Sequence, residues 1–277
     1  MNTVSGLRTL RASSLAVTIF SVILLAAGIV QLTLGALEVK RIYERIAEIE
    51  ELTRPTTIYG YQSQYRETEA KYVRSSTALI EKAYFSGGPK APEWNSPVAI
   101  SAIVLVVAGL AFFIAMLVWV WRAHANLERA GIRQKYTPGK ALASYLIPIV
   151  NLIIPFEAMR ELHNRSHGET EDFAHSTVED VTAWWTAVVV GLVIFSMMLL
   201  KFALDLSSNL IIMTPLWMEY AIVCFAVVLL LGSAFLFSRL ARAITAAQAE
   251  FLPTIDPNDF KQEEIARPKV RIVGSQT

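Results

Sequence analysis

Four long stretches of the chain contain no Asp, Glu, Lys or Arg: residues 12–37, 95–121, 181–200 and 220–238. A helix needs about 20 mostly apolar residues to cross ~30 Å of hydrocarbon, because each residue rises ~1.5 Å. A helix also satisfies its own backbone polar groups where no water reaches them. The pattern therefore predicts an all-α fold, namely a polytopic membrane helix bundle with four spans.

A fifth apolar stretch, residues 141–156, is interrupted by Pro148, Asn151 and Pro155. The prolines remove backbone donors, so a continuous helix is unfavourable. We expect a kinked interfacial or re-entrant element here; a kinked fifth span is the alternative. The following residues place Met159 and Leu162 on one edge and polar residues such as Glu161 opposite, which predicts an amphipathic helix at the cytoplasmic interface.

The spans divide the chain into four parts. Residues 1–37 form the N-terminus and first span, 38–94 an extracytoplasmic helical hairpin, 95–250 the main membrane domain, and 251–277 a flexible cytoplasmic tail. An apolar stripe at three- and four-residue spacing over 39–52 predicts that the first helix continues beyond its span and ends before Pro55.

Basic residues beside the spans predict the orientation. Arg8 and Arg11 precede the first span, and Arg239 and Arg242 follow the fourth. Both termini are therefore expected to be cytoplasmic in a multi-pass protein of the bacterial cell membrane. Lys40 and other basic residues after the first span are evidence against this orientation.

The charge balance excludes one class of partner. The chain has 25 Lys and Arg against 24 Asp and Glu, a formal net charge of +1. The chain therefore lacks the excess of basic residues that indicates nucleic-acid binding. The single cysteine, Cys224, lies inside the fourth span and has no second cysteine with which to form an internal disulfide.

The histidines and the charges at span ends are the candidate chemical groups. His124, His163, His167 and His175 lie in one segment, and the spacing of His163 and His167 would suit one metal. Solvated surface histidines are the simpler interpretation, so no metal or cofactor is expected. The other candidates lie at the outer ends of the third and fourth spans, where Lys201 is expected to pair with Asp205 or Glu219 near the membrane surface.

Aromatic and basic residues mark the expected membrane boundaries. All six Trp residues fall at or near predicted span ends, where an indole favours the headgroup region. After the second span, Arg129, Arg133, Lys135 and Lys140 could bind anionic lipid headgroups or simply direct topology.

The block from residue 121 to 162 reads WRAHANLERAG, then YTPGKA, then YLIPIVNLIIPFEAMREL. It resembles the bacterial membrane-protein family catalogued as domain of unknown function 4328, over about residues 97–250. The resemblance rests on Arg122, Asn126, Leu127, Gly131, Pro138, Gly139, Pro148, Ile149, Asn151, Pro155, Met159, Arg160 and Glu161. Lys140 and His163 depart from the family pattern. The resemblance implies a bacterial multi-span protein and brings no established activity.

The motif has a structural and a functional interpretation. As a structural staple, Asn151 would hydrogen-bond carbonyls freed by the prolines, while Arg160 and Glu161 would pair with Arg122 or Glu128. The staple or partner site comprises Arg122, Asn126, Pro138, Gly139, Pro148, Asn151, Pro155, Met159, Arg160 and Glu161.

Three classes of function fit this pattern. We expect a non-enzymatic membrane component that binds membrane lipid, a protein partner or a second copy as a homo-oligomer. The alternative is a small channel or transporter that uses the broken segment from Pro148 to Pro155 as a re-entrant gate. A third class is a membrane enzyme that acts on lipid through Asn151, Arg160, Glu161 and the histidines.

Overall fold

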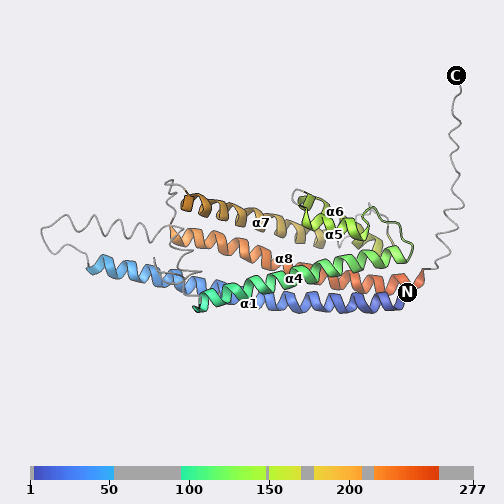
Figure 1. The fold of residues 1–277 in the computed structure, drawn as a ribbon, viewed down its shortest axis with the longest axis horizontal. Coiled ribbons are helices and arrows are strands. Elements are labelled where there is room, and N and C mark those ends of the chain that lie inside the picture. Colours follow the sequence, from blue (N-terminus) through green and yellow to red (C-terminus); the bar gives the residue numbers. More distant parts are fainter. Residues whose placement is uncertain (1–2, 53–94, 148–149, 170–177, 208–214, 256–277) are drawn as a thin grey trace, which may run out of the picture. The chain divides into compact units, whose positions relative to one another are not determined.

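The computed structural model describes residues 3–52, 95–147, 150–169, 178–207 and 215–255. Long helices dominate it: α1 (Thr3–Leu52), α4 (Pro97–Arg129), α7 (Val178–Ser207) and α8 (Leu216–Phe251). Short helices lie between α4 and α7: α5 (Pro138–Leu146), η1 (Val150–Leu152) and α6 (Ile154–Ser166). A last turn, η2 (Leu252–Thr254), follows α8. The predicted all-α class is confirmed, and Figure 1 shows these elements.

The four-span prediction is confirmed for the part of the chain that the structure describes. Four of its helices are long and apolar enough to cross a membrane: Gly6–Glu44, Pro97–Arg129, Glu179–Leu204 and Leu216–Thr254. In each of these helices, no more than 33% of the most apolar 18-residue segment is buried by the rest of the protein. Large apolar surfaces of this kind require a nonaqueous surrounding, which is what a lipid bilayer provides.

The first helix continues past its apolar stretch, as the sequence predicted. α1 runs without a break to Leu52, and Ile42 is buried. The rest of the expected hairpin, residues 53–94, and the tail from residue 256 lie outside the described residues.

The segment with the two prolines is broken, also as predicted. α5 ends at Leu146, and Ile147 takes an extended conformation with ψ 117°. α6 begins again at Ile154, with Pro155 in its first turn, where the missing N–H costs no helix bond. Pro148 lies outside the described residues.

The chain divides into two compact units, each of which has its own packing. Unit 2, Thr18–Ile114 with Ala183–Phe237, contains mainly the apolar parts of α1, α4, α7 and α8. There the Ser21 hydroxyl donates to the Ala234 carbonyl at 3.2 Å, and Gln31 bonds Ser101. Gly28 lies so close to Leu231 that a Cβ would clash with it. These contacts join α1 to α8 and to α4.

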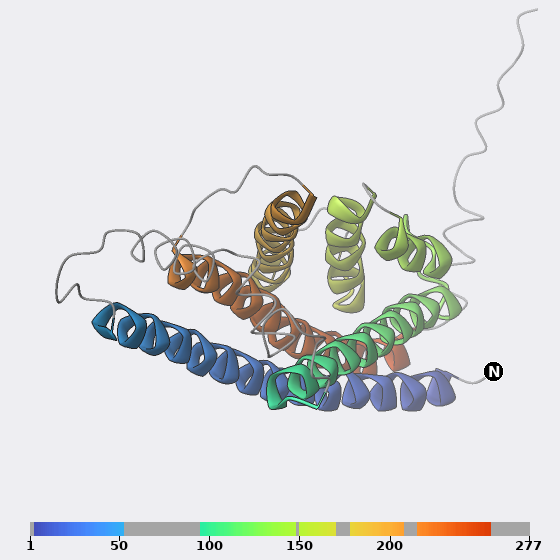
Figure 2. The ribbon, with the colours of Figure 1, turned by 60° about the vertical axis from the view of Figure 1, so that its left-hand side comes forward.

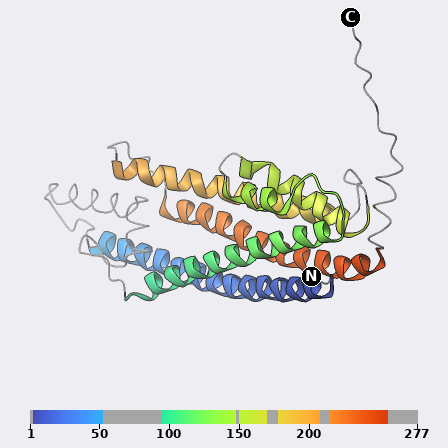
Figure 3. The same ribbon diagram turned by 45° about the vertical axis from the view of Figure 1, so that its right-hand side comes forward.

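Unit 1, Met1–Val17 with Ala115–Thr182 and Ser238–Thr277, contains α5, α6 and the adjoining helix ends. Trp119 Nε1 donates to Thr245 Oγ1 at 3.1 Å, and Gln248 Nε2 donates to the Ala123 carbonyl and to Ser166 Oγ, both at 3.1 Å. These bonds join α4, α6 and α8. Figures 2 and 3 show α5 and α6 side by side near the C-terminal end of α4.

Candidate functional site

The C-terminal end of α4 supplies the first wall of the candidate site. The N–H of Ile132 donates to the Leu127 carbonyl at 3.0 Å, and the N–H of Gly131 to the Glu128 carbonyl at 3.0 Å. This is a Schellman ending, and Gly131 takes the left-handed conformation, with φ 83°, that such an ending requires. The chain therefore turns sharply after α4 and leads back toward it.

A side-chain pair fixes the loop that follows. His124 Nδ1 lies 2.7 Å from Gln134 Oε1, and Gln134 Nε2 donates to the His124 carbonyl at 2.9 Å. Gln134 therefore bonds both the ring and the backbone of one α4 residue. This arrangement holds the loop 131–137 against the helix from which it came.

Glu161 on α6 holds the same loop from the other side. The N–H of Lys135 donates to its Oε1 at 2.6 Å, and the N–H of Tyr136 donates to its Oε2 at 3.0 Å. The carboxylate therefore accepts two consecutive backbone N–H groups, and hydrogen bonds to a charged acceptor are the stronger kind. Glu161 is 2% exposed, so the prediction that it lies on the polar face of an amphipathic helix was wrong.

Glu157, one helical turn before Glu161, makes a second link to this loop. It accepts a hydrogen bond from the Tyr136 hydroxyl, and Lys135 Nζ lies 3.4 Å from its Oε2. The Tyr136 hydroxyl and then Lys135 lower the pKa of Glu157, although partial burial opposes them. Burial, followed by the bond to Glu157, raises the pKa of Tyr136. Two carboxylates of α6 thus anchor residues 135 and 136.

The anchored loop leads directly into α5. Thr137 is the residue before the helix, with extended geometry (φ −63°, ψ 158°), and Pro138 is its first residue. Proline suits this position because its fixed φ is helical. The Thr137 side chain makes no capping hydrogen bond. Both residues therefore take their places from the two anchors just upstream.

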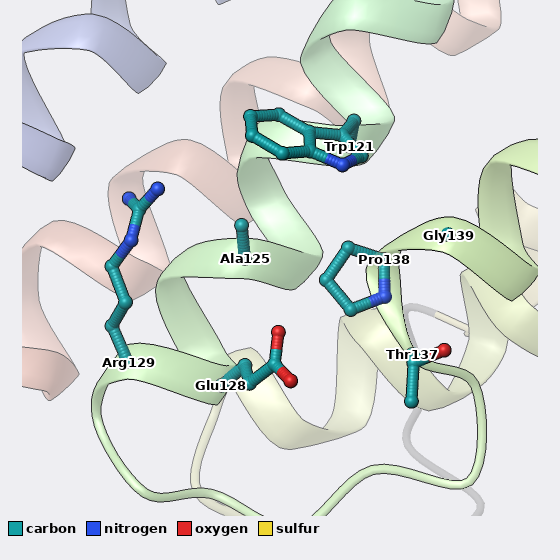
Figure 4. A pocket seen from close by; sticks show the side chains of 7 residues that line it. All are labelled: Trp121, Ala125, Glu128, Arg129, Thr137, Pro138 and Gly139. Carbon is teal, nitrogen blue, oxygen red and sulfur yellow. The ribbon is translucent and has the colours of Figure 1, made fainter.

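A pocket of about 560 Å³ lies between the end of α4 and the start of α5. Its lining residues, shown in Figure 4, are Trp121, Ala125, Glu128, Arg129, Thr137, Pro138 and Gly139. The four α4 residues follow a spacing of four, three and one, which places them along one side of the helix. An exposed indole, a carboxylate and a guanidinium therefore line the same pocket.

The two charges of the pocket lie on different sides of it. In Figure 4 the Glu128 carboxylate is directed toward Pro138 and Thr137, whereas the Arg129 side chain extends along the opposite side of Ala125. Arg129 Nη1 donates to Asn126 Oδ1 at 3.0 Å, which fixes the guanidinium near the helix. Within the described residues, Glu128 forms no ion pair. The pocket thus offers separated positive and negative groups.

Among the described residues, three of the predicted site residues line this pocket: Pro138, Gly139 and Arg129. Arg122 and Asn126 instead bond α1, since Arg122 Nη1 donates to the Thr9 carbonyl at 2.9 Å and Asn126 Nδ2 to the Gly6 carbonyl at 3.4 Å. The expected pairing of Arg160 and Glu161 with Arg122 or Glu128 was therefore wrong, because none of these ion pairs forms among the described residues.

The remaining predicted residues have other positions. Met159 is buried at 1% exposure, and Arg160 is half-buried on α6. Asn151 donates through its backbone N–H to the Ile147 carbonyl at 2.9 Å, and within the described part of the chain its side chain makes no hydrogen bond. Arg133 and Lys140 are exposed beside the pocket but do not line it.

Two histidines contradict the prediction of solvated rings. His124 and His163 are 0% and 2% exposed. His163 and His167 have ring centroids 4.5 Å apart, and His167 Nδ1 lies 2.8 Å from the His163 carbonyl. Among the described residues, no group of three or more His, Cys, Asp or Glu could hold a metal ion. His175 lies outside those residues.

In unit 2, the predicted charge pair forms between α7 and α8. Lys201 Nζ lies 2.9 Å from Glu219 Oε1, and the two side chains are 14% and 2% exposed. The pairing with Glu219 is confirmed, and the Glu219 side chain is buried within the chain. The side chain of Asp205 lies outside the described residues.

The residues that sequence reasoning missed are Trp121, Glu128 and Thr137, together with the role of Glu161. The helical spacing of Trp121, Glu128 and Arg129 is the signal in the sequence that could have found them, whereas the composition of span ends predicts only a boundary role for tryptophan. Trp119 and Trp184 are in fact core residues, 0% and 2% exposed. Trp121 is 44% exposed.

Comparison with known proteins gives one match. A family model described as Domain of unknown function (DUF4328) matches residues 95–246, which include the whole pocket. No curated protein and no solved structure matches the chain.

Proposed function

The chain belongs to the family described as Domain of unknown function (DUF4328), and on that premise we propose that it is a non-enzymatic, multi-pass membrane protein that binds phospholipid headgroups in the α4–α5 pocket. The observation that carries the proposal is the pocket itself, where an exposed indole and a fixed guanidinium line one cavity directly after an uncharged span.

The location of the pocket supports a headgroup as its occupant. The uncharged stretch that begins at residue 95 ends at Trp121, and the pocket begins with that residue. Tryptophan favours the headgroup layer, because its ring is apolar and its N–H needs a partner. A cavity at this level of the helix would face phosphate groups rather than acyl chains.

Charge supports the same occupant. A guanidinium presents five donors that suit phosphate oxygens, and the bond to Asn126 uses only one nitrogen of Arg129. Around the pocket, Arg133, Lys135 and Lys140 are exposed. Each basic residue near an anionic bilayer contributes about 1 kcal/mol of attraction, so these residues would hold the pocket against the membrane surface.

The broken segment that follows α5 exposes apolar side chains. Leu146, Ile147, Leu152 and Ile153 are 58%, 48%, 54% and 64% exposed. Such a cluster is unfavourable in water and favourable in lipid. It supports an interfacial or re-entrant position for residues 146–147 and 152–153.

Orientation and location are part of the proposal. The basic residues Arg8, Arg11, Arg239 and Arg242 flank the first and last spans, which favours cytoplasmic termini. The pocket follows the second span and would then face the cytoplasmic leaflet of the cell membrane.

The test measures phospholipid retained by the full chain after purification in mild detergent. We expect tightly held lipid phosphate in the wild type, and Arg129→Ala should reduce it severalfold. Arg133→Ala is the matched control, because Arg133 is an exposed neighbour that does not line the pocket. Equal retention by both variants would refute the pocket as the site. If no phospholipid is retained after purification and the reconstituted protein conducts ions across proteoliposomes, the transport alternative is favoured instead.

A further inference from the structure

The pocket contains a feature that phosphate binding alone does not explain, namely the carboxylate of Glu128. It is exposed, lines the cavity, and has no ion-pair partner among the described residues. A site built only for an anion would exclude a carboxylate, because like charges repel at close range. The lining instead carries one negative and one positive side chain, Glu128 and Arg129.

We propose that the pocket selects a zwitterion in which a phosphodiester is joined to a primary ammonium, as in a phosphoethanolamine headgroup. This inference rests on the proposed headgroup function and names the ligand class. Arg129 takes the phosphate and Glu128 takes the ammonium. The two side chains extend from adjacent residues along different sides of the pocket, so they bind opposite ends of one ligand (Figure 4).

One further lining residue, Thr137, suits the ammonium end. The Glu128 carboxylate is directed toward Thr137, whose hydroxyl makes no capping bond with α5 and can accept a hydrogen bond. A primary ammonium donates hydrogen bonds to a carboxylate and a hydroxyl, whereas a quaternary choline has no N–H to donate. The site therefore distinguishes ethanolamine from choline.

Charge also distinguishes the ligand from a glycerol headgroup. Phosphatidylglycerol carries a phosphate without an ammonium, so it would leave the Glu128 carboxylate unpaired beside an anion. The same chemistry occurs in a membrane lipid and in a soluble glycerophosphoethanolamine. The experiment distinguishes these two sources.

The test uses the full chain in nanodiscs of three compositions, each with a fixed fraction of phosphatidylethanolamine, phosphatidylcholine or phosphatidylglycerol. Bound lipid is identified by native mass spectrometry. The wild type should prefer the ethanolamine lipid by about fivefold, the scale of one exposed ion pair. Glu128→Gln should reduce the preference to about onefold, because binding of the ethanolamine lipid weakens to the level of the other two lipids. Glu250→Gln, an exposed glutamate of α8 outside the pocket, is the control and should behave as the wild type.

The outcomes separate the two proposals. If no phospholipid is found bound to the wild type, the headgroup function is refuted. Bound phospholipid without an ethanolamine preference in the wild type, or a preference that Glu128→Gln leaves intact, would refute only the zwitterion selectivity. Competition by soluble sn-glycero-3-phosphoethanolamine at low concentration would identify a soluble ligand of the same class. Binding of the lipid alone would identify the membrane as the source.

Discussion

Replacing Glu161 with glutamine should release the loop that forms one wall of the pocket. The carboxylate is 2% exposed and accepts the backbone N–H groups of Lys135 and Tyr136 at 2.6 and 3.0 Å. Glutamine has nearly the same shape but only one acceptor oxygen, so its NH₂ group must face one of the two donors. One buried N–H then loses its partner.

The magnitude follows from these two bonds. An unsatisfied buried donor costs about 1–3 kcal/mol. The remaining hydrogen bond then has a neutral acceptor instead of a charged one, which removes about half of its strength. The sum is about 3 kcal/mol. For a chain of this size, 1 kcal/mol moves the melting temperature by about 2–4 °C. We therefore expect Glu161→Gln to melt about 6–12 °C below the wild type.

Two measurements check this prediction in detergent. Thermal melting compares Glu161→Gln with Glu250→Gln, the same substitution at an exposed position, which should change the free energy of unfolding by no more than about 0.5 kcal/mol. Hydrogen exchange should rise in the peptide that contains residues 131–139, because its anchored amides become accessible. Identical melting temperatures for the two variants, with no change in exchange, would refute the role assigned to the carboxylate.

Two further substitutions probe the surroundings of the pocket. Because the folded state lowers the pKa of Glu157, its contribution to stability is present above the ordinary carboxyl range and is lost as the pH falls through the lower, folded value. The difference in melting temperature between wild type and Glu157→Gln should therefore shrink below about pH 4, and a difference independent of pH would contradict this. Tyr145 has a buried hydroxyl without a partner in the described part of the chain, and burial raises its pKa. Tyr145→Phe should be neutral or stabilising by up to about 1 kcal/mol in a melting assay, and a clear loss of stability would show a missed partner.

Some features of the molecule were predictable because they depend on neighbours along the chain. The need for about 20 apolar residues to cross a bilayer is local, so the four spans could be recognised from their runs alone. Two prolines seven residues apart interrupt any helix, and α5 and α6 are separate for that reason. The pairing of Lys201 with Glu219 could be predicted for a related reason. Two spans that follow each other in the chain have their adjoining ends close together.

The buried polar groups were misjudged because sequence patterns assign a polar residue to the solvent. Glu161 and His124 look like surface residues in a helical pattern. Both are buried because loop 131–137 folds back over them and supplies backbone or side-chain partners. No spacing rule predicts which loop will return to which helix.

The amino-acid sequence is therefore enough to define the apolar helices, the break between them, and the family to which residues 95–246 belong. Contacts between distant parts of the chain establish that Glu161 binds a loop, that Trp119 lies in the core, and that Trp121, Glu128 and Arg129 line one pocket with the start of α5. The physical reason is range. Crossing a bilayer is a property of consecutive residues, whereas satisfying a buried carboxylate requires donors that the fold brings from 25 or 26 positions away.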